Sequence, residues 1–324
     1  MKKFMRVCAI MALIFLALGF ALGAVGSRMA GRSTISQVVE TATRGRIHLN
    51  MGSWWNWGVT AGDNFFRGLF GGDDVSYDIG DVSMFDSDHE ILNGKVEKYC
   101  PGSDVHNLMI EVGGCQFETK SSDDAFIYLE VKNANKFQGY VEDGTLYIKT
   151  TAEAVNWSKV NDCKITLYLP DGYRFDEVDI ELGAGEMKLK RLYAGEASLN
   201  VGAGQITVDG IQSQEVKITI GAGDVKLEGM EITELEAEVG LGEFEADGSI
   251  NGSAQVKCSM GNVEMKLNGE EKAFNYRLEG SMGNIDLGKK NYSGFSNEVV
   301  LDNGADKEMQ VECSMGNISI RFRD

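Results

Sequence analysis

Proline and histidine are scarce in this chain of 324 residues, which contains two prolines and three histidines. With so little proline, we expect the turns and strand ends of the chain to depend mainly on its 40 glycines. His48, His89 and His106 have no partner at catalytic or metal-ligand spacing, and the HExxH, GxSxG, CxxC and Walker motifs are absent. The sequence therefore predicts that the protein is not an enzyme and that it binds no cofactor or metal.

The cysteines do not form the pattern of a disulfide-rich protein. Five of the six lie beyond the N-terminal apolar segment, and this odd number does not indicate a full set of bridges. The pairing that we consider is Cys100 with Cys115. Cys258 and Cys313 are assigned to the core of repeats two coils apart, where roughly 10 Å would separate them, beyond the ~7 Å that a bridge spans between Cα atoms.

Basic residues are too few to balance the acidic ones. Lys and Arg number 31 against 49 Asp and Glu, which gives a formal net charge of −18. Such a surface repels the phosphates of nucleic acids and of anionic lipids, so we expect no nucleic acid partner. The acidity keeps a soluble surface from self-association or, as an alternative, collects divalent cations on one face.

The N-terminal segment carries the longest apolar run. Three basic residues precede residues 7–26, which have no charge and can span roughly 30 Å of hydrocarbon as a helix. We expect a cytoplasmic tail over residues 1–6, a transmembrane anchor over residues 7–26 in contact with membrane lipid, and an extracellular remainder. The alternative is a cleaved signal peptide, which would make the protein secreted, because Ala24 and Gly26 suit a signal peptidase site.

Residues 27–98 are rich in Gly, Ser, Asn and Asp and are predicted to form a linker. Within the linker, residues 52–72 place aromatic side chains at three- and four-residue intervals, as in a short amphipathic helix. This segment would cap an open end of the following domain, lie at the membrane interface, or bind a partner. The residues assigned to a membrane interface are Trp54, Trp55, Trp57, Phe65, Phe66 and Phe70.

Seven copies of a short glycine-centred element dominate the second half of the chain. They include VGAGQITV (Val201–Val208) and CSMGNISI (Cys313–Ile320), and the first five copies recur at a constant interval. Their central glycines are Gly185, Gly204, Gly223, Gly242, Gly261, Gly283 and Gly316. A fixed period is typical of stacked units that bury a core only against their neighbours.

Each copy has the pattern of two short strands joined by a glycine corner. Before the corner, Val178, Ile180 and Leu182 alternate with acidic residues, and Met187 and Leu189 continue the alternation after it. Glycine suits the corner because it enters positive φ freely and leaves space for a neighbouring backbone.

This pattern predicts an all-β fold. We expect a single-stranded parallel β-solenoid with about 19 residues per coil over residues 99–324, preceded by one transmembrane helix and a linker. Weaker alternation between Leu108 and Pro170 predicts earlier coils of the same stack. An antiparallel sandwich of hairpins is the alternative.

The runs ITLYLP (Ile165–Pro170) and VDIELGAGEM (Val178–Met187), followed by GAG and SMGN corners, resemble the bacterial β-strand-repeat family described as putative adhesins. The resemblance covers Leu108–Asp324 and the N-terminal anchor. It implies a bacterial envelope protein held by one N-terminal helix. It implies no activity, since the family has no agreed catalytic motif.

The last three corners read Ser-Met-Gly-Asn. Stacked asparagines can form a hydrogen-bonded ladder, so these corners either pack one end of the domain or form an exposed ridge that binds a glycan or protein ligand. Calcium is disfavoured because the position that would hold its Asp ligand is apolar in every copy, as at Met187. The candidate ridge comprises Met260, Asn262, Met282, Asn284, Met315 and Asn317.

We expect a non-enzymatic, envelope-anchored extracellular protein that serves as an adhesin or binding scaffold. One alternative is an accessory or sensor protein of an envelope-stress response. The other is a polysaccharide-active β-helix enzyme, which would need carboxylates across a groove. The outward-facing carboxylates are Asp224, Glu243, Glu245, Glu264 and Asp286, and no Arg or Lys is evidently paired with them.

Overall fold

The computed structural model describes residues 86, 88–100, 104–150, 163–293 and 297–323. All of them belong to one compact unit, Asp74–Asp324. Within these ranges the chain is β-structure with a single 3-10 turn, so the predicted all-β class is confirmed. No helix long and apolar enough to cross a membrane occurs in the described ranges. The tail (residues 1–6), the anchor (7–26) and the aromatic segment (52–72) lie outside them.

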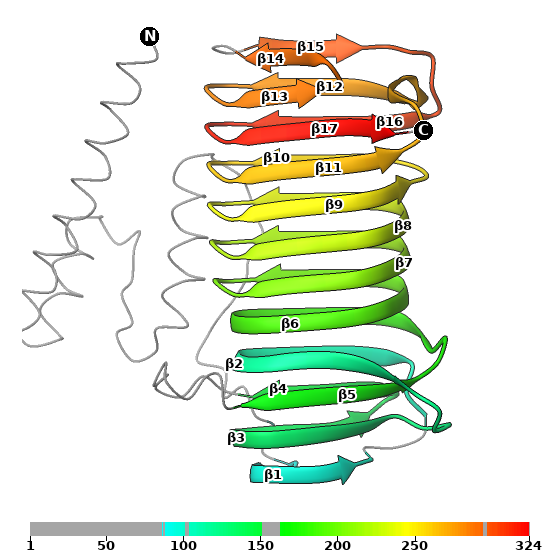
Figure 1. Cartoon of the computed structure of the whole chain (residues 1–324), viewed down its shortest axis with the longest axis vertical. Coiled ribbons are helices and arrows are strands. Elements are labelled where there is room, and N and C mark those ends of the chain that lie inside the picture. Colours follow the sequence, from blue (N-terminus) through cyan, green and yellow to red (C-terminus); the bar gives the residue numbers. More distant parts are fainter. Residues whose placement is uncertain (1–85, 87, 101–103, 151–162, 294–296, 324) are drawn as a thin grey trace, which may run out of the picture. The chain divides into compact units, whose positions relative to one another are not determined.

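Within the described ranges, seventeen strands form one sheet, whose arrangement Figure 1 shows. The first nine strands are β1 Leu92–Tyr99, β2 Asn107–Ser122, β3 Tyr128–Glu142, β4 Thr145–Thr150, β5 Lys164–Pro170, β6 Arg174–Val201, β7 Gln205–Ile220, β8 Asp224–Val239 and β9 Glu243–Ile250. The others are β10 Ala254–Cys258, β11 Asn262–Asn268, β12 Phe274–Gly280, β13 Asn284–Leu287, β14 Lys290–Ser293, β15 Asn297–Leu301, β16 Lys307–Cys313 and β17 Asn317–Arg323; the 3-10 turn η1 is Glu271–Ala273. All of β1 except its last residue, Tyr99, lies in the segment that the sequence assigns to the linker.

The central strands β6–β9 pair in parallel with the offset that the repeat dictates. Gln205 of β7 pairs with Glu186 of β6 on one side and with Asp224 of β8 on the other, one repeat away in each direction. Alternate side chains along each strand point inward, and those of successive coils form apolar columns in one continuous core. Like residues therefore stack on like residues.

The corners need glycine mainly because a side chain would collide with the neighbouring corner, and less because of the backbone conformation. φ is positive at Gly185 but not at Gly204, Gly223 or Gly242. A Cβ added to Gly242 would overlap the carbonyl oxygen of Gly223 in the coil below, and the same clash recurs between Gly223 and Gly204. Only glycine lets consecutive corners approach this closely.

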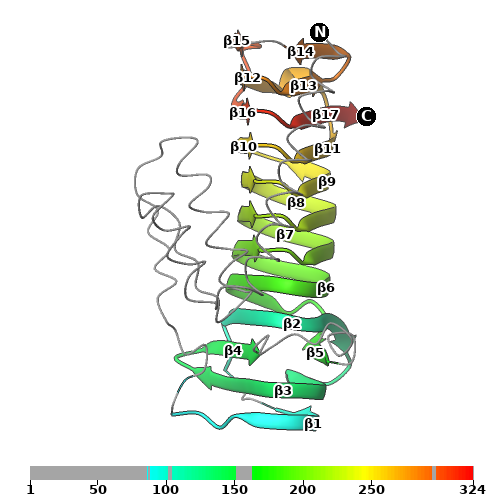
Figure 2. The same cartoon turned by 90° about the vertical axis from the view of Figure 1, so that its left-hand side faces the viewer.

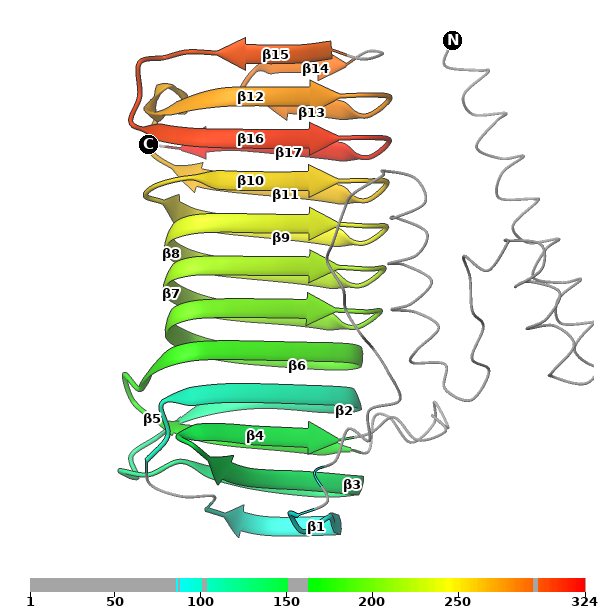
Figure 3. The same cartoon turned by 180° about the vertical axis from the view of Figure 1, so that it is seen from behind.

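The coil order differs from the chain order at the C-terminal end (Figures 1 and 3). β10 pairs in parallel with β8 on one side and with β16 on the other, and β16 in turn pairs in parallel with β12. β17 likewise lies between β11 and β13. The seventh repeat is thus inserted between the fifth and the sixth. The antiparallel strands β14 and β15 then cover the sixth.

The N-terminal end shows the same kind of inversion, which Figure 2 displays from the side. β2 lies between β6 and the pair β4 and β5, all in parallel. β3 runs antiparallel to β4 and β5, and β1 runs antiparallel to β3. The expectation of a continuous parallel stack from Leu108 onward is therefore wrong at this end. Antiparallel strands terminate the parallel coils at both ends, where an uncovered coil would expose its edge.

The cysteines correct two predictions. Cys115 forms a disulfide with Cys163, with 5.0 Å between the Cα atoms, so the pairing of Cys100 with Cys115 is wrong. Cys258 and Cys313 are direct register partners on the neighbouring strands β10 and β16. The expectation that another coil lies between them is therefore wrong. The sequence estimate failed because it took the order of the coils from the order of the chain.

Candidate functional site

The corner side chains of the last coils form a row of four long apolar residues, Leu241, Met260, Met315 and Met282, which we call the methionine ridge. Backbone hydrogen bonds fix the row: Met260 N donates to Gly240 O at 2.9 Å, and Met315 N donates to Ser259 O at 2.7 Å. Met282 N donates to Ser314 O at 2.7 Å. The row follows the spatial order of the coils, with Met315 between Met260 and Met282.

The methionine ridge is exposed. Leu241 is 55% accessible, Met282 54% and Met315 40%, and Met260 is partly buried. In the preceding coils, alanine occupies this column, as at Ala203 and Ala222. The large apolar side chains are therefore confined to one end of the stack.

The asparagines beside the ridge form only part of the predicted ladder. Asn317 Nδ2 donates to Asn262 Oδ1 at 3.1 Å across neighbouring coils. Asn284 is in register with Asn317, but its amide donates to Asp286 Oδ2 at 3.2 Å and its Oδ1 accepts from Asn291 Nδ2 at 2.6 Å. All six candidate ridge residues are brought together, although the chain order places a long insertion between them.

The three Ser-Met-Gly-Asn corners of the ridge are uncharged, whereas at the Leu241 corner the acidic Glu243 stands in register with Asn262. Ser259, Ser314 and Ser281 precede the three methionines, and the asparagines follow them after one glycine. This composition contrasts with the chain as a whole, whose net charge is −18. An exposed apolar row bordered by hydroxyl and amide groups is typical of a surface that contacts another molecule.

Two of the carboxylates considered for catalysis, Glu245 and Glu264, are engaged in ion pairs. Lys226 Nζ lies 3.6 Å from Glu245, and Glu264 Oε1 lies 3.2 Å from Lys266 Nζ and 3.7 Å from Arg321 Nη1. For these two acids the prediction that no Arg or Lys is evidently paired is wrong: Lys226 and Arg321 come from neighbouring coils, and Lys266 lies two residues from Glu264 on β11. In the ranges that the structure describes, no three His, Cys, Asp or Glu side chains gather as a metal site.

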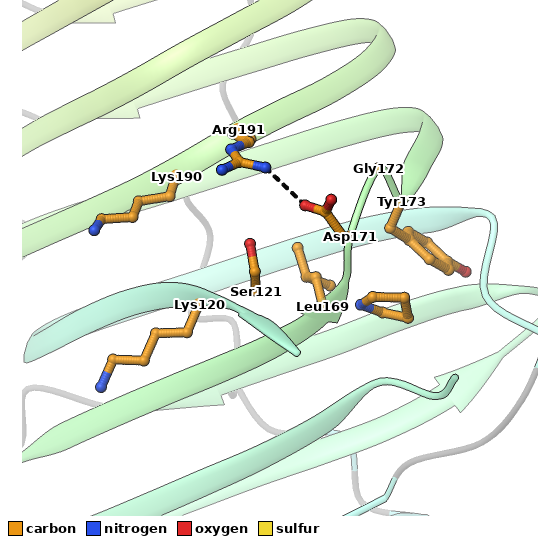
Figure 4. A pocket seen from close by; sticks show the side chains of 9 residues that line it. Lys120, Ser121, Leu169, Asp171, Gly172, Tyr173, Lys190 and Arg191 are labelled. Carbon is orange, nitrogen blue, oxygen red and sulfur yellow. Dashed lines mark hydrogen bonds and ion pairs between the residues drawn. The ribbon is translucent and has the colours of Figure 1, made fainter. Parts of the chain in front are cut away.

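A second surface, which the sequence did not reveal, lies on β5, β2 and β6 (Figure 4). Lys120, Lys190 and Arg191 line a small pocket there, with Asp171 opposite Arg191 at 2.7 Å. Tyr168 borders the pocket residues, since Lys120 Nζ lies 5.9 Å from its ring centroid. No sequence signal could have found this cluster, because its members come from strands that are distant in the chain.

The charges of this second surface are largely matched. Glu118 lies 2.6 Å from Lys120 Nζ and 3.0 Å from Lys164 Nζ and accepts a hydrogen bond from Thr166 Oγ1 at 3.2 Å. Burial raises the pKa of Glu118, but the hydrogen bonds and charges of the two lysines outweigh burial and lower the pKa to about 2. We therefore assign this cluster to the stability of the N-terminal coils.

Stacked, glycine-cornered β-strand repeats with antiparallel ends define the class of this protein. The Toastrack DUF4097 family matches residues 105–321, and the chain belongs to this family. The expected membership of a β-strand-repeat family is confirmed over that range. No curated protein sequence matches the chain.

Solved structures of low identity resemble parts of the fold. A protein of Bacteroides fragilis NCTC 9343 named as a putative adhesin is 14% identical with a TM-score of 0.40, over 71% of this chain and 96% of its own. A protein of Clostridium sporogenes ATCC 15579 named as a putative cell adhesion protein is 12% identical with a TM-score of 0.30, over 72% and 99%. A protein of Parabacteroides distasonis ATCC 8503 named as a putative lipid binding protein is 16% identical with a TM-score of 0.36, over 72% and 97%. These scores are too low to carry a functional argument.

Proposed function

We propose that the protein is a non-enzymatic β-solenoid, held at the outer face of the cell envelope by residues 7–26, which acts as an adhesin-type binding scaffold. The observation that carries this proposal is the methionine ridge. A stack of coils holds its side chains at a spacing of about 4.8 Å on a rigid frame, so the ridge is preorganised for contact.

The chemistry of the ridge favours a protein partner with an uncharged, partly apolar surface. Methionine side chains adapt their shape to a partner and bury apolar area. A charged partner would lose hydration against the three methionine corners without gaining an opposite charge there, because the serines and asparagines of these corners are neutral. The hydroxyl and amide groups can accept and donate hydrogen bonds at the rim of such a contact.

The test is binding of the purified full-length chain, in detergent, to immobilised collagen, fibronectin, laminin and a set of neutral glycans. We expect binding to one of the matrix proteins, weakened at least tenfold by the double variant Met282→Glu with Met315→Glu. The matched control is Ala203→Glu with Ala222→Glu, which places the same charges in the same corner column of earlier coils. This control should bind like the unmodified chain.

Two results would contradict the proposal. Equal loss in both double variants would show that added negative charge alone weakens binding, and no loss in either would exclude the ridge. Binding to none of the probes, together with an altered envelope-stress response after deletion of residues 52–72, would favour the sensor alternative. Turnover of an acidic glycan that is lost in Glu264→Gln would favour the enzyme alternative.

A further inference from the structure

We infer that Cys258 and Cys313 are the site of a second disulfide, which ties the inserted seventh repeat to the fifth. The two residues are register partners on the parallel strands β10 and β16. Neighbouring strands lie about 4.8 Å apart, within the 4.4–6.8 Å that disulfides span between Cα atoms. Both side chains face the core and are 2% exposed.

The sulfur of Cys258 is directed toward the coil that carries Cys313. Its Sγ lies 3.2 Å from Gly261 O, and a Cβ added to Gly316 in the next coil would come within 2.6 Å of that sulfur. Gly316 follows Cys313 by three residues in the same corner. The absence of a side chain at Gly316 leaves the space into which the Cys258 sulfur projects, and the Cys313 sulfur projects in the same way toward Gly283 of the coil beyond.

The disulfide at the other end of the sheet shows that this fold joins cysteines of neighbouring parallel strands. Cys115 and Cys163 directly precede the register pair Gln116 and Lys164, and their Cα atoms are 5.0 Å apart. That bond ties the inserted strand β2 to β5. A bond between Cys258 and Cys313 would give the inserted repeat at the C-terminal end the same kind of attachment.

The two thiols differ in acidity in a way that suits bond formation. Cys313 accepts a hydrogen bond from Cys258, and this bond lowers the pKa of Cys313. Burial raises that pKa, whereas the backbone N–H groups of Asn284 and Gly316 lower it further. The pKa of Cys258 is raised by its hydrogen bond to Cys313 and by burial. Cys313 is thus the better nucleophile, because the thiolate is the reactive form.

The reaction requires an oxidant of the disulfide class. The Cys313 thiolate attacks one sulfur of the oxidant's disulfide. The attacked sulfur becomes bonded to Cys313 as a mixed disulfide, and the other sulfur leaves as a thiolate. The Cys258 thiol then loses its proton and attacks the Cys313 sulfur, which releases the second thiol. The two cysteines together lose two electrons and two protons, and the oxidant is reduced to two thiols.

The bond would fix the corners that present the methionine ridge. Met260 follows Cys258 by two residues, and Met315 follows Cys313 by two. A covalent link between β10 and β16 would prevent these corners from separating when the end coils open. This consequence rests on the proposed function of the ridge, whereas formation of the bond does not.

The experiment uses the full-length chain, reduced and then exposed to oxidised glutathione both when folded and during refolding from denaturant. Remaining thiols are alkylated in denaturant, and the digested chain is analysed by mass spectrometry. We expect a linked Cys258–Cys313 peptide that is two hydrogens lighter than its separate parts, and at least tenfold less alkylation of both residues. The refolding arm is included because the folded chain buries both thiols.

Two variants make the result decisive. Cys115→Ser with Cys163→Ser should still form the link, whereas Cys258→Ser should leave Cys313 alkylated or bound to glutathione. In the linked form, amide exchange of β16 and β17 should slow at least tenfold, with β7 as the unchanged reference. Full alkylation of Cys258 and Cys313 in both arms would overturn the inference. Loss of ligand binding in Cys258→Ser with the ridge intact would concern the proposed function and not the bond.

Discussion

Met315 donates its backbone N–H to Ser259 O at 2.7 Å, although all of β12–β15 lies between these residues in the chain. The contact means that the last residues of the domain are internal to the sheet. Removing them would not shorten the stack from its end but would take out the layer on which β12 and β13 rest.

A chain that ends at Asp302 tests this arrangement. It lacks β16 and β17, so β12 and β13 lose their parallel partners. We expect amide exchange of β12–β15 to rise about 100-fold or more, because these strands lose their main source of local stability. Exchange in β6 and β7 serves as the internal control. Unchanged protection of β12–β15 would mean that the sixth repeat docks directly on the fifth.

Gly242→Ala tests the steric requirement of the corners. The added methyl group would overlap Gly223 O, so we expect a loss of about 2–4 kcal/mol in the free energy of unfolding. The matched control is Gly280→Ala, where an added Cβ meets no atom within 4 Å. That variant should stay within about 0.5 kcal/mol of the unmodified chain. Denaturant unfolding followed by circular dichroism measures both, and equal effects would refute the steric explanation.

Glu118→Gln should make the protein less stable at neutral pH but not in acid. The pKa of Glu118 is lowered from 4.5 to about 2 in the folded state, so its stabilising effect is complete above pH 4.5 and is lost as the pH falls toward 2. We expect a loss of roughly 2 kcal/mol at pH 7 that disappears near pH 2. Glu228→Gln, which removes an exposed partner of Lys226, is the control and should have little effect at either pH. A pH-independent loss would contradict the ionic explanation.

Asp179→Asn should act in the opposite direction. Burial raises the pKa of Asp179, while hydrogen bonds from Ser198 and the backbone of Ile180 partly oppose that rise. Its Oδ1 is buried without a hydrogen-bond partner among the described residues. A raised carboxyl pKa destabilises the fold increasingly as the pH rises above the unfolded value of 3.8.

Thermal unfolding at pH 7 and at pH 3 measures this effect. We expect Asp179→Asn to raise the midpoint at pH 7 and to leave it nearly unchanged at pH 3, where the carboxyl group is protonated in both states. The exposed residue Asp209, changed to Asn, is the control and should shift neither midpoint. A lower midpoint for Asp179→Asn at pH 7 would show that the negative charge is stabilising.

The repeat unit could be predicted from the sequence because its determinants are local. The apolar alternation around Val216 and Val225 sets the face of each strand, and the close approach of Gly223 to Gly204 explains the constant corner spacing. The six methionines and asparagines of the candidate ridge were found by the same column alignment, and the structure brings them together. Whether they bind a partner stays a prediction.

What the sequence determined by itself is the coil: two strands of alternating polarity, a glycine corner and a constant offset from one copy to the next. What only the tertiary structure decided is which coil lies beside which. Every coil offers the same apolar columns and the same unpaired backbone groups, so a local pattern cannot distinguish one neighbour from another. The choice is made by the long connections and by the need to cover the end coils, and it is this choice that places Cys313 against Cys258 and Met315 between Met260 and Met282.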